Sequence, residues 1–520
     1  MMNRIPPAAK MDKLRNLFAR NQRPIVFTAL ICIAAGVVLS HHLAPGVKVE
    51  EVMLASDTPA LKFAPSSAGP HPVALLAHGY SGTKENLFWY GEALSAAGFV
   101  CYSADLPGHG ESPRLYSFVE TAHAIGDFTR NIGPVDVLVG HSMGGGAVGE
   151  AVREGLVRPK LVIAVGSGPR LGENGPPLLL LVGRFDEFFK SEELKTRTDA
   201  RLIISPWSNH GLELFDPLLI HAAVNAACAA VGEAPPPAFT AWRWRVAGIA
   251  LAVLGAFGLV VVLPKFPPRF EWARGILVAA LVGSVWFLTL STYVDLKPHP
   301  QNFLPQITGT VITLLVLIGA GKLCVPRLIF AALAIAIAIG GIIVTDIMAA
   351  HMTIHLFQIV RFSLVFAPAL FVGTIVGMFA SFRGSRQSGD VAMALIVGCG
   401  LCQLGNTPRA IPESTKVHQF IKLDAKLCNA CVGQYEFALD NVFRSPANMK
   451  IWRKGDQMFE QATGRRVLLG AHEIFPESET NFFLKSNGAE LTFVKNGKGE
   501  VTKLIHHMDG LPDSEAKKVN

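Results

Sequence analysis

Charged residues are scarce in this 520-residue chain. They make up 17% of it, whereas soluble domains usually carry about 25%. Hydrophobic residues reach 50%, and the mean hydropathy is +0.36. The shortage of charge is local, because nearly all the long apolar runs fall in two windows, residues 24–43 and 242–408. The composition therefore indicates a membrane protein that also carries soluble domains.

Cysteine is scarce too, with eight residues in the chain. Their scatter excludes a disulfide framework, and we interpret the C-x-x-C pair Cys428 and Cys431 as packing residues. The sequence also lacks a basic stripe interleaved with aromatic residues. The net charge of +7 is therefore no sign of nucleic-acid binding. Six basic residues precede the first apolar window: Arg4, Lys10, Lys13, Arg15, Arg20 and Arg23.

The apolar runs predict seven membrane spans. Residues 25–40 follow the basic tail without a clean cleavage site, which favours a signal anchor over a signal peptide. The second window resolves into six segments, each long enough to cross a bilayer and the last only marginally. These segments are residues 243–264, 274–294, 304–321, 326–347, 355–380 and 391–407.

Basic residues alternate between the loops of the second window. By the positive-inside rule the basic loops are cytoplasmic, so the chain is predicted to start inside and to end outside. We expect a multi-pass protein of the cell membrane, with both soluble domains extracytoplasmic, in the periplasm or at the cell surface. The basic loop residues are Lys265, Arg269 and Arg274, then Lys322 and Arg327, then Arg383 and Arg386.

Residues 409–520 are predicted to form a small antiparallel β domain. Short alternating runs lie between Asn-Gly and other Gly-containing turns. The runs are residues 434–439, 449–454, 465–470, 480–485, 489–495 and 500–507. The full division is a basic cytoplasmic tail (1–23), an anchor (24–43), an α/β domain (48–232), a Pro-rich linker (233–241), six transmembrane helices (242–408) and the β-rich domain (409–520).

The α/β domain contains a motif typical of a nucleophilic serine. Residues 135–146 read VDVLVGHSMGGG, in which an apolar strand runs into G-H-S-M-G and then into small residues that open a helix. Side chains at Gly140 and Gly144 would collide with neighbouring backbone in so tight a turn. The turn would hold Ser142 in a strained conformation with its hydroxyl group exposed, and His141 precedes it. We therefore predict that Ser142 is a nucleophile.

Two further motifs precede this turn. Residues 72–82 read PVALLAHGYSG, and residues 99–112 read FVCYSADLPGHGES. Together, H-G-Y-S-G, D-L-P-G-H-G-E-S and G-H-S-M-G-G resemble the α/β-hydrolase superfamily, close to its dienelactone-hydrolase-like and small esterase members. The resemblance spans about 185 residues and implies a mostly parallel sheet flanked by helices.

The resemblance also implies roles for residues near Ser142. The loop at His78 and Gly79 would support an oxyanion hole formed by the backbone amides of Tyr80 and Met143. The triad order in this fold is Ser, acid, His. Asp186 follows the apolar run LLLLVG, and His210 follows RLIIS.

We therefore predict Asp186 as the acid and His210 as the base. Glu187 and Asp199 compete for the acid, and His221 competes for the base. The short interval between Ser142 and Asp186 leaves no room for a large cap, so the site should be open.

Other polar residues are given structural interpretations. His78 and His109 are expected to be structural or pocket-lining, and Asp105 to bond its own loop. Four ionisable residues lie near helix ends at the predicted outer face, where their side chains reach water at low cost. They are Asp346, His351, His355 and Arg361. We predict no metal and no cofactor.

These features predict a membrane-anchored serine hydrolase, most simply a carboxylic ester hydrolase that acts through an acyl-enzyme on a small ester or a lipid. An acyltransferase or peptidase with the same triad remains open. So does a transport or sensor protein that uses the hydrolase fold as a binding module. Segments 431–437, 468–485 and 489–507 resemble the small β module that follows some bacterial serine β-lactamase-like hydrolases, and a substrate-gating or interaction role is expected for them.

Overall fold

The structure is a computed structural model of the whole chain. It divides into two compact units, one built of apolar helices and the other of the β-sheets. The residues that it describes are 22–55, 57–80, 82–114, 116, 118–172, 174–186, 188–234, 239–293, 373–382, 384–404, 421, 425–437, 447–464, 467–468, 472–484, 489–507 and 513–519.

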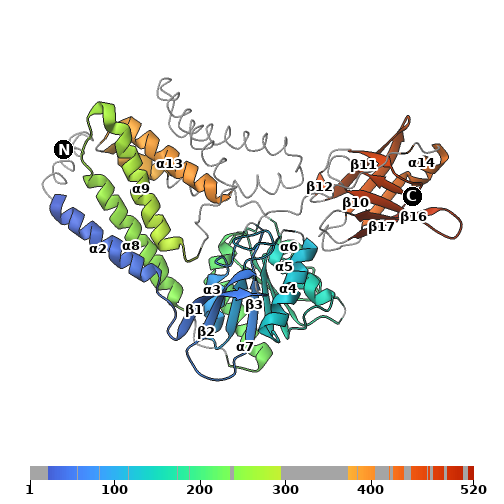
Figure 1. The fold of residues 1–520 in the computed structure, drawn as a ribbon, viewed down its shortest axis with the longest axis horizontal. Helices are drawn as coiled ribbons and strands as arrows, with labels where there is room; N and C mark the ends of the chain where they lie inside the picture. The colour runs from blue at the N-terminus through green and yellow to red at the C-terminus, as the bar shows by residue number, and fades with distance from the viewer. Residues whose placement is uncertain are drawn as a thin grey trace, which may run out of the picture. The chain divides into compact units, whose positions relative to one another are not determined.

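An eight-stranded sheet forms the α/β domain, in the order β1-β2-β4-β3-β5-β6-β7-β8. The strands from β3 to β8 run parallel, and β2 is antiparallel to its two neighbours, β4 and β1. This mixed sheet between helices is the predicted α/β-hydrolase fold (Figure 1). The strands are Val47–Leu54 (β1), Thr58–Pro65 (β2), Val73–Ala77 (β3), Val100–Ala104 (β4), Val137–His141 (β5), Leu161–Val165 (β6), Leu178–Gly183 (β7) and Arg201–Ser205 (β8).

Helices cover both faces of this sheet. Helices α3 (Phe88–Ala96) and α7 (Pro217–Val231) contact each other, as do α4 (Phe118–Ile132) and α5 (Met143–Arg153). The central strands β5, β6 and β7 are buried along their whole length. A parallel sheet covered on both faces requires this, and it explains the uninterrupted apolar runs LVIAV and LLLLV.

The local sequence fixes where α7 begins and ends. The side chain of Asp216 accepts a hydrogen bond of 2.8 Å from Leu218 N, and Pro217 occupies the first turn. Gly232 ends the helix at φ 80°, a conformation that glycine adopts at little cost. Helix α7 therefore starts beside the loop that follows β8 and packs back along the sheet toward its amino edge.

Both chain ends of this domain lie at the amino edge of the sheet. Val47 pairs with Pro65, and Leu54 pairs with Thr58 at the opposite edge, where Ala60 pairs with Ala104. The segments from α2 (Gln22–Ser40) and to α8 (Ala241–Val262) therefore join the domain at the edge opposite the carboxyl ends of the parallel strands.

Apolar helices form the other unit. Helices α2 (Gln22–Ser40), α8 (Ala241–Val262) and α9 (Glu271–Leu290, extended by a short turn, η2, from Pro268) are long and apolar enough to cross a membrane. Helix α13 (Arg386–Leu404) packs against α9, and a shorter apolar helix spans Gly373–Phe382. Helix α2 overlaps the predicted anchor, and the other four helices overlap the first, second, fifth and sixth predicted segments of the second window. The third and fourth lie outside the described residues.

Small residues allow α2 and α8 to approach closely. A Cβ atom at Gly36 would lie 2.5 Å from Ala252 N, and one at Gly248 would lie 2.5 Å from Ser40 N. Such contacts are typical of helices that associate in a bilayer. At one end of the pair the buried Arg245 donates from Nε to His42 O at 3.0 Å. The segment after α2 is thus held within the helical unit.

The C-terminal strands close into a barrel. Eight strands follow one another in the order β10-β9-β17-β16-β15-β14-β13-β11, and β10 pairs with β11 to complete the ring. A short strand, β12 (Val467–Leu468), pairs antiparallel with the end of β11. The ring strands are Gly433–Phe437 (β9), Ala447–Lys454 (β10), Gln457–Gly464 (β11), His472–Pro476 (β13), Asn481–Phe483 (β14), Glu490–Lys495 (β15), Val501–His507 (β16) and Ser514–Lys518 (β17).

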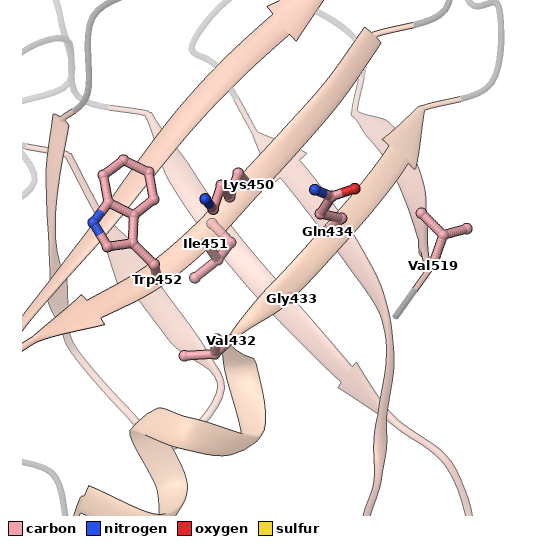
Figure 2. A pocket seen from close by; sticks show the side chains of 7 residues that line it. All are labelled: Val432, Gly433, Gln434, Lys450, Ile451, Trp452 and Val519. Atoms are coloured by element: carbon pink, nitrogen blue, oxygen red, sulfur yellow. The ribbon is translucent and has the colours of Figure 1, made fainter.

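The predicted antiparallel β domain is therefore confirmed, although β11 and β17 had not been predicted. Cys428 and Cys431 lie on the short helix α14 (Ala425–Cys431), buried in the barrel core. Burial raises the pKa of Cys431 to about 12, which fits packing residues. A shallow hollow of 510 Å³ on the barrel is lined by the residues labelled in Figure 2, among them Gln434, Lys450 and Trp452. It contains none of the predicted site residues.

Candidate active site

The predicted catalytic residues follow three parallel strands at the same edge of the sheet. Ser142 follows β5, Asp186 lies three residues after β7, and His210 lies in the segment between β8 and α7. The carboxyl ends of parallel strands meet at one edge, which is where open α/β sheets hold their ligands. All three side chains are largely buried.

Ser142 occupies a strained turn between β5 and α5. Its φ is 52° and its ψ is −116°. Ser142 and Ala55 are the non-glycine residues with positive φ in the described part of the chain. Such a conformation costs about 1–3 kcal/mol and persists only where the surroundings impose it. The helix starts at the next residue, so its amino-terminal amide groups lie beside the serine.

The glycines of the motif permit the close packing that imposes this turn. A Cβ atom at Gly140 would lie 2.5 Å from Gly144 O, and one at Gly144 would lie 2.2 Å from Ala77 O. The predicted collisions with backbone at both positions are confirmed. Gly145 also has no room, because its Cβ would lie 2.4 Å from the Cβ atom of Ser167. The Ser167 hydroxyl group in turn donates to Ser142 O at 2.9 Å.

His210 and Asp186 form a hydrogen-bonded pair. Nδ1 of His210 lies 2.9 Å from Oδ2 of Asp186. The other carboxylate oxygen accepts from the backbone amides of Phe188 and Phe189, both at 2.7 Å. Burial alone would raise the pKa of Asp186, but the bond from His210 and these two amides outweigh it and hold the pKa below its usual value. The acid is thus an oriented acceptor for the imidazole ring.

Aromatic rings enclose His210. The His210 ring lies 4.7 Å from the Phe188 ring, 5.8 Å from the stacked Phe189 ring and 4.8 Å from the His141 ring, measured between centroids. Nε2 of His141 lies 3.1 Å from the backbone oxygen of His210. Burial and the neighbouring His210 lower the pKa of His141 to about 3. His141 is therefore neutral at ordinary pH and supports His210 through packing and a hydrogen bond.

The loop predicted to supply an oxyanion amide is held by His78. Leu106 N donates to Nε2 of His78 at 3.0 Å, so the ring proton is on Nδ1, which lies 2.8 Å from Gly79 O. Burial lowers the pKa of His78, in agreement with this neutral form. A Cβ atom at Gly79 would lie 2.7 Å from Nδ1 of His141. The loop therefore packs directly against the serine motif.

Tyr80 belongs to an aromatic cluster beside this loop. Its ring lies 5.6 Å from that of His109 and 5.5 Å from that of Tyr116. His109 contacts the His78 ring as well, at 5.2 Å. The structural interpretation given to His78 and His109 agrees with these contacts.

The competing residues lie in other surroundings. Asp199 is exposed and pairs with Arg197. His221 lies within α7, with its Nε2 atom 3.1 Å from the Asn225 amide nitrogen. Glu187 lies outside the described residues. Of the acids considered on the described part of the chain, only Asp186 contacts His210.

Sequence reasoning missed a buried lysine next to the site loops. Nζ of Lys84 lies 2.7 Å from Glu111, 3.1 Å from Asp105 and 3.3 Å from Glu85. Asp105 also accepts from Lys84 N and Glu111 N, so its predicted role in bonding its own loop is supported. Burial opposes the charge on Lys84, yet these carboxylates raise its pKa.

His141, His210 and Glu213 are close enough to be considered as metal ligands, since one ligand atom from each lies within 4.8 Å of the others. The nitrogens already have partners, because His210 Nδ1 bonds to Asp186 and His141 Nε2 lies against His210 O. The geometry therefore fits a supported base better than an ion site. The cluster of Asp346, His351, His355 and Arg361 lies outside the described residues.

A serine in a strained strand–helix turn, with an Asp–His pair at the same edge of a mostly parallel sheet, is the arrangement of an α/β-hydrolase domain. The model of the alpha/beta hydrolase family matches residues 74–356, more than half of the chain. The chain belongs to the alpha/beta hydrolase family. The matched stretch continues past α7 into the apolar helices.

Several solved structures are similar to the hydrolase domain. Est1E from Butyrivibrio proteoclasticus, solved with ferulic acid bound, is 17% identical, with a TM-score of 0.30; the match covers 35% of this chain and 100% of that one. A thermophilic esterase from Thermogutta terrifontis is 16% identical, with a TM-score of 0.29, and the match covers 35% and 99%. Carboxylesterase CesB from Bacillus subtilis is 12% identical, with a TM-score of 0.30, and the match covers 40% and 99%. No curated protein matches the chain.

Proposed function

We propose that this protein is a membrane-anchored serine hydrolase that cleaves carboxylic esters through an acyl-enzyme. The observation that carries the proposal is the strained Ser142 at the same sheet edge as the hydrogen-bonded pair Asp186 and His210. The strained backbone of Ser142 lowers the stability of the fold, and a catalytic role for its hydroxyl group would explain why the strain is kept.

In the proposed reaction, Ser142 Oγ attacks the ester carbonyl carbon while His210 Nε2 takes the hydroxyl proton. The tetrahedral intermediate then expels the alcohol, which receives that proton from His210, and an acyl-serine remains. Water attacks the acyl-serine with His210 again as the base, which releases the carboxylic acid and restores Ser142. Asp186 keeps the Nδ1 proton in place and stabilises the imidazolium.

The backbone amides of Tyr80 and Met143 are proposed to bind the oxyanion. Met143 is the first residue of α5, and amide groups at a helix amino terminus lack partners within the helix. The positive end of the helix dipole favours negative charge there. Tyr80 follows the loop that His78 holds against the serine motif.

Three apolar helices of membrane-crossing length support the anchored part of the proposal. The alternation of basic loops supports the proposed topology, in which the hydrolase and barrel domains lie outside the cytoplasm. Modification of single cysteines with an impermeant maleimide tests this. Cysteines placed at Ser67 and Lys498 should react in intact cells, and one placed at Arg383 should react only after lysis. Protection of the position at Lys498 in intact cells would contradict the proposed sidedness.

A fluorophosphonate probe tests the chemistry. The full-length protein in detergent should be labelled at Ser142, and Ser142→Ala should abolish the labelling and reduce kcat by about 10⁴–10⁶-fold. Ser67→Ala, on an exposed loop residue, is the matched control and should label normally. Labelling that persists in Ser142→Ala would remove the assignment.

A further inference from the structure

A second buried carboxylate lies beside the base. Glu213 is three residues after His210, on the short helix η1 (Leu212–Phe215), and its side chain is fully buried. Its Oε2 atom lies 3.9 Å from His210 Nδ1 and 4.0 Å from His141 Nε2. Its Oε1 atom accepts from the backbone amide of Gly183. One carboxylate thus joins the segment that carries His210 to the end of β7, three residues before Asp186.

The absence of a side chain at Gly166 leaves room for the Glu213 carboxylate. Gly166, directly after β6, has a φ of 50°, and a Cβ atom there would lie 2.1 Å from Glu213 Oε2. Val165, one residue earlier, accepts the hydrogen bond of Ser142 N at 2.9 Å. The buried Tyr90 of α3 donates to Glu213 O at 3.0 Å. Glu213 is therefore held at the point where the segments of all three proposed catalytic residues meet.

The titratable groups that face His210 in the described part of the chain are Asp186, Glu213 and His141. His141 is neutral because its pKa is lowered to about 3, so it does not offset the carboxylates. A carboxylate within about 4–6 Å of an imidazole favours its protonated form. Burial keeps this effect from being screened by water.

We propose that Glu213 is a second acid that positions His210 and shares with Asp186 the stabilisation of the imidazolium formed during the reaction. This rests on the proposed serine-hydrolase function and adds a residue to it. Asp186 bonds directly to the Nδ1 proton, while Glu213 acts from 3.9 Å away and fixes the segment that carries the base.

Glu213→Gln separates this role from a structural one. The glutamine side chain keeps an oxygen that can accept the hydrogen bond from Gly183 N. A purely structural role of Glu213 would therefore survive the change. The negative charge, in contrast, is lost. The pH dependence of kcat/KM for p-nitrophenyl acetate is measured on the full-length protein in detergent. Its acidic limb should move to lower pH by about 1 unit, because the imidazolium loses a stabilising charge. At optimal pH, kcat should fall about tenfold at unchanged KM.

Asp186→Asn and the double variant complete a cycle. Glu213 is the remaining acid when Asp186 is replaced. Glu213→Gln should therefore reduce kcat by a larger factor in the Asp186→Asn background than in the wild type. Glu192→Gln, which changes an exposed carboxylate on α6 (Ser191–Leu194), is the matched control and should leave the pH profile in place.

The outcomes separate this proposal from the function it rests on. If Ser142→Ala kept its turnover, the serine mechanism would fall and the role of Glu213 with it. If Ser142→Ala were inactive but Glu213→Gln had the wild-type pH profile and equal cost in both backgrounds, only the second acid would be overturned. A low yield of folded Glu213→Gln would shift the test to Glu213→Met, which also removes the charge. It should move the acidic limb in the same direction, and an unmoved limb would overturn the second acid.

Discussion

Nδ1 of His210 lies 2.9 Å from Oδ2 of Asp186, and the other oxygen of that carboxylate is held by two backbone amides of the same loop. An acid with both oxygens occupied cannot turn away from the imidazole ring. This pair therefore favours the tautomer of His210 with its proton on Nδ1, the form in which the proposed base would act through Nε2.

Asp186→Asn should reduce kcat by about 10³–10⁴-fold, because an asparagine at this place can stabilise the wrong tautomer of His210. Asp199→Asn is the matched change at the competing acid, which pairs with Arg197 on the surface, and it should leave kcat unchanged. Steady-state kinetics on a p-nitrophenyl ester compares the two. Damage from Asp199→Asn with a silent Asp186→Asn would reverse the assignment.

Lys84→Met should destabilise the hydrolase domain by about 3–5 kcal/mol, because it leaves the buried Asp105 without its cation. The Lys84 side chain is 2% exposed, and Asp105 is fully buried. Lys62→Met is the matched control. It breaks the surface pair with Glu50, whose side chains are 30% and 58% exposed, and should cost about 0–1 kcal/mol. Urea unfolding measures both, and equal costs would contradict the prediction.

The strands of the hydrolase core could be predicted from sequence because burial on both faces leaves an unbroken apolar run, as in LLLLV before Asp186. The serine motif could be predicted because its turn requires glycine at fixed positions. Strand β17 could not, since SEAKK has little apolar pattern and is placed by pairing with β16 and β9. Similarly, β1 reads VKVEEVML and is half exposed.

The buried charged residues beside the site could not be predicted for a related reason. Glu213 and Lys84 are charged residues in ordinary polar segments, and their burial is decided by distant parts of the chain. Gly166 and Gly183 are 47 and 30 residues away from Glu213 in sequence, yet they contact its carboxylate. The spacing of three residues between His210 and Glu213 was the available signal, and it becomes informative only when the turn between them is known.

Acid should destabilise the hydrolase domain partly through His141. Its pKa is about 3 in the folded protein and about 6.5 in an unfolded chain. Between these values only the unfolded state binds the proton, so stability decreases as the pH falls from about 6.5, by at most about 1.4 kcal/mol per pH unit for this group.

His141→Gln should therefore flatten the decline in Tm between pH 7 and 4.5, measured by calorimetry in detergent. Some slope should remain, because burial also lowers the pKa of His78. Asp186 does not contribute to the slope in this window. Its pKa is lowered in the folded protein, so protonation of Asp186 reduces stability only below about pH 3.9. Ser67→Ala changes an exposed side chain that does not titrate and should leave the slope alone. Parallel curves for the wild type and His141→Gln would contradict this account.

The substrate is expected to be a short, soluble ester with little discrimination between acyl chains. The described residues between Ser142 and Asp186 form α5, β6, β7 and their connections, with no inserted cap among them. A site without a cap offers few contacts to the acyl chain, and one methylene group is worth only about 1–3 kcal/mol even in a formed pocket. Comparing kcat/KM for p-nitrophenyl acetate, butyrate, octanoate and palmitate in detergent tests this, with Ser142→Ala as the blank. We expect a shallow dependence that favours the short chains. A sharp optimum at octanoate or palmitate, or hydrolysis of phospholipid vesicles in preference to soluble esters, would instead require a long acyl-binding pocket and a lipid substrate.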